Sequence, residues 1–176
     1  MKIELLFNAM KRSKTIKNKV YKFVHIQDEY ILTNLIGRHF SNEWLEIQDD
    51  GKIIVKGSHG EGYAWDGCSP KWNFIDLIGG TPDGRLDYTT EQQITYYASM
   101  FHDALYQYKS KISISKKEVD FLFKLNLKKA DFLLTSIYYF AVRLFGGLYG
   151  KWNIRASQKK IEIYEFSWPH KKNYNI

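Results

Sequence analysis

The hydrophobic pattern of the chain changes near residue 90, and this change limits the folds that it can adopt. Before this point, aromatic and β-branched residues stand in short runs, at 20–26, 30–35, 44–47 and 53–55. Such runs are typical of β-strands. After it, the apolar stretches are longer and are preceded by residues that cap helices. The sequence therefore predicts an α+β fold, with antiparallel strands and hairpins in the N-terminal half packed with about three C-terminal helices.

Turn residues divide the first half into its expected strands. Asp49-Asp50-Gly51 lies between the runs at 44–47 and 53–55, and an Asp-Gly step in that position predicts a hairpin. The segment 60–70 contains three glycines and a Ser-Pro step, and residues 79–85 read Gly-Gly-Thr-Pro-Asp-Gly-Arg. Both segments are expected to be loops.

Start and stop signals define three helices in the second half. A Ser or Thr followed three residues later by Glu or Gln forms a capping box, which opens a helix. A glycine just after a helix commonly ends it. The expected helices are 90–108, opened by Thr90 and Gln93; 115–129, opened by Ser115 and Glu118; and a third that Asp131 caps and Gly146-Gly147 ends.

Two further segments complete the expected fold. Phe132–Val142 is the longest apolar stretch, and it falls short of the roughly 18–20 residues that span a bilayer. We expect it to be a buried helix. The tail from Lys160 to Trp168 is rich in aromatic and β-branched residues and is expected to add a final strand.

The length and composition favour a single soluble domain. The chain has 176 residues, only three prolines and no low-complexity linker, so residues 1–176 are expected to form one domain. Six basic residues fall between 11 and 22, within a net charge of +7, and residues 1–18 could form a basic arm. Such an arm could bind an anionic membrane, an acidic partner or nucleic acid, or remain a solvated face. Nucleic acid is the least favoured of these partners, because the chain has no recognisable reader motif.

Cys68 is the only cysteine, so no disulfide can form within the chain. A cytosolic origin, or assembly in a cytosol, is the natural interpretation. The apolar stretch Leu5–Phe7 is too short for a signal peptide, which needs about 7–15 apolar residues. We therefore expect neither a signal peptide nor a transmembrane segment. The thiol of Cys68 is expected to pack as a small buried hydrophobe.

The strongest candidate for chemistry is the segment Phe101-His102-Asp103-Ala104-Leu105-Tyr106. On a helix, His102, Asp103 and Tyr106 share one side, because residues three and four apart are neighbours. A histidine can act as a general base near neutral pH, and a carboxylate beside it can hold a cation. The alternative is a helix that packs on the sheet, with a hydrogen-bonded histidine and a surface aspartate.

Asp120 lies in the apolar run Val119-Asp120-Phe121-Leu122-Phe123 of the second expected helix. A buried carboxylate needs a partner, and the short connection at 109–114 can bring His102 and Tyr106 alongside it. We expect His102 and Asp120 to lie within hydrogen-bond reach. Asp120 would then either orient His102 as a catalytic base or form a structural clamp between two helices.

The glycine loop supplies a third candidate. Gly62 and Gly67 would let backbone atoms approach a ligand closely, and Asp66 and Ser69 add side-chain oxygens. This composition suits an oxygen-rich cation site or an oxyanion-binding loop. Equally, Asp66-Gly67 could be an ordinary turn and Ser69 the cap of a helix.

Together these pieces resemble an uncharacterised domain family that is widespread in tailed bacteriophages and prophages. The resemblance covers roughly residues 50–150. The chain departs from the family pattern at Cys68 and in having Lys116-Lys117 where an arginine is usual before Asp120, which puts an anion-binding role there in doubt. The matching motifs, in chain order, are Trp65-Asp66-Gly67-Cys68-Ser69-Pro70, His102-Asp103-Ala104-Leu105-Tyr106, Asp120-Phe121-Leu122-Phe123 and Val142-Arg143-Leu144-Phe145-Gly146.

The helix pair also resembles, more distantly, the core of phospholipase A2. That resemblance implies that His102 deprotonates water and that Asp120 orients His102 with help from Tyr106. It implies Ca²⁺ bound by Asp103 and by the loop around Asp66, between Gly62 and Gly67, so that the metal stabilises the oxyanion of an ester. Phospholipases of this type are rich in disulfides, which this chain cannot form.

Three hypotheses follow from the sequence. The first is a phage-type ester hydrolase, Ca²⁺-dependent and acting on lipid or the cell envelope. The second is a non-enzymatic virion-associated or tail-assembly protein that contacts other virion proteins, with the polar cluster as a clamp. The third is a metal-dependent phosphohydrolase, which would need an upstream histidine, and His59 is the only candidate. Each places the protein in the cytoplasm of a bacterial host or in a virion. An enzyme predicts a solvent-reachable His102 and a clamp predicts a buried one.

Overall fold

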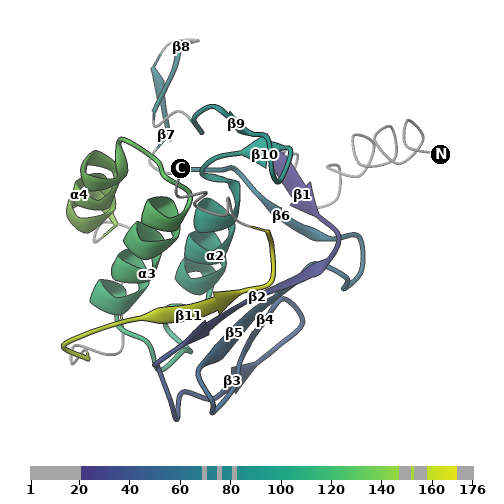
Figure 1. Ribbon diagram of the computed structural model, residues 1–176. Coiled ribbons are helices and arrows are strands. Elements are labelled where there is room, and N and C mark those ends of the chain that lie inside the picture. The colour runs from purple at the N-terminus through teal and green to yellow at the C-terminus, as the bar shows by residue number, and fades with distance from the viewer. Residues whose placement is uncertain are drawn as a thin grey trace, which may run out of the picture.

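The computed structural model describes residues 21–68, 71–74, 77–80, 83–146, 152 and 158–169. The expected basic arm at 1–18 and the candidate Ser69 lie outside the described residues, and the single-domain extent stays a prediction. Within the described part the α+β prediction is confirmed: strands fill the first half, three helices follow, and a last strand returns to the sheet (Figure 1).

The main sheet has five antiparallel strands in the order β11-β2-β5-β4-β3. Its central strands alternate between buried and more exposed residues, as strands with one covered face do. The predicted hairpin is present, and Gly51 makes its turn with a φ of +90°. A Cβ there would also lie 2.2 Å from the Thr33 carbonyl oxygen. The strands are β2 (Asp28–Thr33), β3 (Phe40–Ser41), β4 (Leu45–Ile47), β5 (Lys52–Lys56) and the predicted final strand β11 (Ile163–Phe166).

The described residues also form three two-stranded pairs outside this sheet, and two of them correct the loop predictions. The expected loop at 60–70 contains β6 (Tyr63–Trp65), which pairs with β1 (Phe23–His25) because Tyr63 and Trp65 are buried aromatic residues. The expected loop at 79–85 overlaps the hairpin of β7 (Lys71–Phe74) and β8 (Leu77–Gly80). The third pair joins β9 (Leu86–Asp87) and β10 (Gln92–Gln93).

The first helix starts later than predicted. α2 spans Tyr96–Gln107, so the prediction that Thr90 and Gln93 form its capping box is wrong. Those residues belong instead to the turn and second strand of the β9–β10 pair, where the Thr90 hydroxyl accepts from the Gln92 amide at 3.4 Å. Short hydroxyl side chains stabilise such local turns as readily as helix starts.

The second helix confirms its prediction. α3 spans Lys116–Lys129, and the capping box of Ser115 and Glu118 is complete in both directions. Its end explains why Asp131 does not cap the third helix as expected. Asp131 has a φ of +57°, its amide donates to the Lys128 carbonyl, and the next amide, of Phe132, donates to the Leu127 carbonyl. This is the Schellman arrangement that closes a helix.

α4 spans Thr135–Phe145, with Leu134 as its N-cap residue, and stops at Gly146 as predicted. It lies on the outside of the helix layer, with α3 between it and α2 (Figure 1). The prediction of a fully buried helix at 132–142 is wrong, because Ile137 and Phe140 are exposed. No helix among the described residues is long and apolar enough to cross a membrane.

Two apolar clusters hold the layers together. The larger lies between the sheet and the helices α2 and α3, and includes Ile31, Ile53, Phe101, Leu105 and Leu122. The smaller joins α3 to α4 and contains Phe123, Leu127, Tyr138, Val142 and the buried thiol of Cys68, as predicted for that residue. The polar site described next lies where α2, α3 and α4 meet.

Candidate functional site

The structure brings His102 of α2 and Asp120 of α3 together. The imidazole Nε2 lies 3.4 Å from Asp120 Oδ1, so the expected contact is confirmed. The hydroxyl of Tyr106, one helical turn after His102, donates to the same oxygen at 2.5 Å. The spacing of four residues places both groups on the face of α2 that packs against α3.

The second oxygen of Asp120 receives two cations. Lys116 Nζ donates to Oδ2 at 2.7 Å from one turn earlier on α3, and Arg143 Nη1 donates to it at 2.9 Å from α4. We call Asp120 with His102, Tyr106, Lys116 and Arg143 the Asp120 cluster. Its donors come from three helices, so the carboxylate links α2, α3 and α4.

The backbone of α4 takes part as well. Lys116 Nζ also donates to the carbonyl oxygens of Val142, at 2.9 Å, and Arg143, at 3.3 Å. Gly146 lies directly against Tyr106, and a Cβ on it would come within 2.2 Å of the tyrosine hydroxyl. The φ of Gly146 is an ordinary −62°, so the position needs glycine for space rather than for conformation.

Burial and charge decide what the cluster can do. The Asp120 side chain is fully buried and that of His102 is 6% exposed. Burial alone raises the pKa of Asp120, but hydrogen bonds from His102, Lys116 and Tyr106 outweigh it and the pKa is lowered. Burial alone lowers the pKa of His102, but the nearby carboxylates of Asp103 and Asp120 outweigh this effect and the pKa is raised. The raised pKa favours the protonated imidazole, which would have to lose its proton before it could act as a general base.

Asp103 sits on the other side of His102. Its Oδ1 lies 3.8 Å from His102 Nδ1, and its side chain is 24% exposed. The Asp103 charge also raises the pKa of Tyr63 on β6, after burial as the main cause. Asp103 therefore lies between the Asp120 cluster and β6, where it adds a second negative charge beside the imidazole.

The glycines of the 62–67 loop pack closely against other parts of the protein. A Cβ on Gly62 would lie 2.8 Å from the His25 carbonyl oxygen of β1, and one on Gly67 would lie 2.3 Å from Asp83 Oδ1. Asp83 accepts from the Cys68 amide at 2.8 Å and pairs with Lys22. These two glycines thus allow close packing on β1 and on Asp83.

Asp66 is half-buried between these two glycines. The described residues contain no group of three or more His, Cys, Asp or Glu side chains that could hold a metal ion. His59, which the phosphohydrolase hypothesis needs, is exposed, and it contacts the Glu43 carboxylate and the Trp44 ring.

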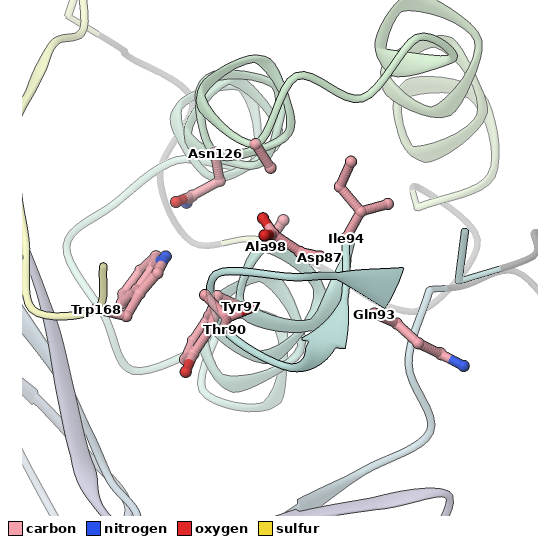
Figure 2. Close-up of a pocket in the computed structure, with 9 residues that line it drawn as sticks. Asp87, Thr90, Gln93, Ile94, Tyr97, Ala98, Asn126 and Trp168 are labelled. Atoms are coloured by element: carbon pink, nitrogen blue, oxygen red, sulfur yellow. The ribbon is translucent and has the colours of Figure 1, made fainter. Parts of the chain in front are cut away.

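A small hollow lies elsewhere, between the β9–β10 pair, the helices α2 and α3, and the end of β11 (Figure 2). Asn126 lines it and is 3% exposed, and neither the nitrogen nor the oxygen of its carboxamide has a hydrogen-bond partner among the described residues. The enclosed space is about 20 Å³. That volume admits about one water-sized group, so the hollow is too small to hold a substrate.

Comparison with known proteins identified no similar protein. The chain matches no protein-family model, and no curated protein and no solved structure is significantly similar to it. The function of the site is therefore inferred from its geometry.

Sequence reasoning found three members of the Asp120 cluster and named Arg143 only through a motif. It missed Lys116 as a partner, although a lysine four residues before a buried aspartate on a helix is a readable signal. Gly146 was named as a helix stop and as the end of a motif, whereas the structure shows that its missing side chain makes room for Tyr106.

Proposed function

We propose that this chain is a non-enzymatic structural or assembly protein, such as a virion-associated or tail-assembly component. In this proposal the Asp120 cluster is a clamp that fixes α4 against α2 and α3. The observation that carries it is the enclosure of the Asp120 carboxylate, which is fully buried and whose two oxygens accept from four side chains.

The charges of the cluster also support a clamp. When His102 is protonated, as its raised pKa favours, its two ring nitrogens carry N–H groups that face Asp120 and Asp103. Lys116 and Arg143 add two further positive charges beside Asp120. Breaking a buried charge pair leaves an uncompensated charge in the interior, which is strongly destabilising. Such a cluster specifies one arrangement of three helices, and function is then exerted by the surfaces that this arrangement presents.

The proposal is tested by the pH dependence of stability. His102 has a folded pKa above its ordinary value of 6.5, so its contribution is complete below pH 6.5 and is lost as the pH rises through the folded pKa. We expect the urea midpoint of the wild type to fall between pH 6.5 and 9, and that of His102→Gln to fall less. His39→Gln, at a 71% exposed side chain, is the control and should follow the wild type. Parallel profiles for wild type and His102→Gln would contradict the clamp.

A second candidate function is the phospholipase A2-like hydrolase. The observation that favours it is the contact of both His102 and Tyr106 with one oxygen of Asp120, which is the orientation that mechanism needs. It also needs Ca²⁺ on Asp103. Calorimetric titration of the wild type and of Asp103→Asn with millimolar Ca²⁺ tests this requirement, and an absence of binding heat for the wild type would remove the calcium mechanism.

A further inference from the structure

The outer face of α4 is apolar and exposed. Residues 133, 137, 140 and 144 are spaced by four, three and four, so they form one stripe along the helix and the turn before it. Leu134 lies beside them. The side chains of this face, with their exposed fractions, are Leu133 (94%), Leu134 (46%), Ile137 (62%), Phe140 (64%) and Leu144 (55%).

The opposite face of α4 is apolar too, and it already has a partner. Tyr138 and Val142 are buried in the cluster with Phe123 and Leu127 of α3. A helix that is apolar on all sides is normally covered on all sides. Five of the ten large hydrophobic residues that are exposed in the described part of the chain belong to this one face. Scattered exposed apolar residues are ordinary, but a contiguous patch marks an interaction surface.

The charges around this face identify its partner. From residue 124 to residue 146 the chain has four basic residues and a single acidic one, Asp131. Lys128 and Lys129 are exposed at the end of α3 that leads into the stripe. Lys124 lies over the rings of Phe121 and Tyr139, at the seam between α3 and α4. The rim of the apolar face is therefore cationic and complementary to an anionic surface.

A second copy of the chain fits this face less well. In a two-fold dimer through this face, the cationic rims of the two copies would lie close together and repel each other. Each copy has only one carboxylate in this region, that of Asp131, to reduce the repulsion. The five residues expose about 600 Å² in total, which falls short of the roughly 800 Å² that a stable interface buries on each partner. An anionic lipid surface needs neither a matching acidic rim nor a large area, since apolar insertion and headgroup attraction act together.

We propose that the outer face of α4 docks on an anionic lipid surface. The helix lies parallel to the surface, with the stripe from Leu133 to Leu144 in the interfacial layer over about 16 Å of helix length. Lys128 and Lys129 extend to the phosphate groups of the lipids, and the net charge of +7 adds long-range attraction. This docking is peripheral, and it uses a face that the Asp120 cluster holds outward.

Sedimentation with lipid vesicles tests the proposal. The probes are vesicles of about three parts phosphatidylcholine to one part phosphatidylserine, and vesicles of phosphatidylcholine alone. We expect the wild type to bind the anionic vesicles and to be released by salt. Ile137→Ser/Phe140→Ser should bind about tenfold more weakly or worse, because apolar insertion is lost. Lys128→Gln/Lys129→Gln should lose roughly tenfold on anionic vesicles only.

The matched control is Ile36→Ser/Leu86→Ser, which removes two equally exposed apolar side chains away from α4 and should bind like the wild type. All of these substitutions are at exposed positions, and urea melts verify that the variants fold. Failure of the wild type to bind anionic vesicles, or equal binding by Ile137→Ser/Phe140→Ser, would overturn the proposal. Dimerisation that depends on Ile137 and Phe140 would overturn it by assigning the face to a second copy. None of these outcomes depends on the protonation of His102. Vesicle binding therefore tests the docking face, and the pH dependence of stability tests the clamp independently.

Discussion

Asp120→Ala is expected to lower the free energy of unfolding by about 3–5 kcal/mol, the range for breaking a buried ion pair. The substitution removes the acceptor of four side-chain donors. It leaves the largely buried ammonium of Lys116 without its counter-charge and the buried imidazole of His102 with only the more distant Asp103 carboxylate. Urea unfolding with matched slopes gives the difference directly.

The control for this change is Asp49→Ala. The Asp49 side chain is 76% exposed, and its removal should change the free energy of unfolding by no more than about 0.5 kcal/mol. Asp120→Asn keeps the shape of the side chain but not its charge, and is expected to fall between the two. An Asp120→Ala midpoint equal to that of the wild type would show that the carboxylate does not hold the helices together.

The second large effect is expected at Gly146. A Cβ at this position would lie 2.2 Å from the Tyr106 hydroxyl and 2.5 Å from the Val142 carbonyl oxygen, so Gly146→Ala must displace α4 or rotate the tyrosine away from Asp120. Overpacking of this kind lowers the free energy of unfolding by about 1–3 kcal/mol. The higher helix propensity of alanine relative to glycine offsets part of this loss. Thermal or urea unfolding measures the loss.

A double-mutant cycle separates crowding from any other effect of this alanine. In a Tyr106→Phe background the hydroxyl is gone, so Gly146→Ala should cost distinctly less than in the wild type. The contact with the Val142 carbonyl remains, so part of the cost should persist. If the losses in the free energy of unfolding were strictly additive, Gly146 and Tyr106 would not be in contact. The contribution of α4 to the cluster would then need another explanation.

The parts of the fold that could be predicted are those set by local chemistry. Ser115 and Glu118 form their capping box because both partners lie within one turn of the same helix. The partnership of Asp120 with His102 was predictable for a different reason, since a carboxylate in an apolar helical run must find a donor nearby. The short connection between α2 and α3 left few alternatives.

The predictions that were wrong concern features that depend on contacts between residues far apart in the sequence. Thr90 and Gln93 have the residue types of a capping box, but the segment returns on itself as the β9–β10 pair. The stretch at 132–142 is apolar enough for a buried helix, yet periodicity cannot reveal that one of its faces is covered while Phe140 is exposed. The role of Gly146 was hidden as well, because it depends on where the Tyr106 hydroxyl lies in space.

The protonation of His102 tests the clamp most directly. An NMR titration of the ¹⁵N-labelled imidazole reports the pKa and the state of each ring nitrogen. We expect a pKa above 6.5, with both Nδ1 and Nε2 protonated at pH 6.5, because Asp103 and Asp120 flank the ring. A neutral imidazole at that pH, with one nitrogen free to accept a proton, would contradict the clamp and favour a catalytic base.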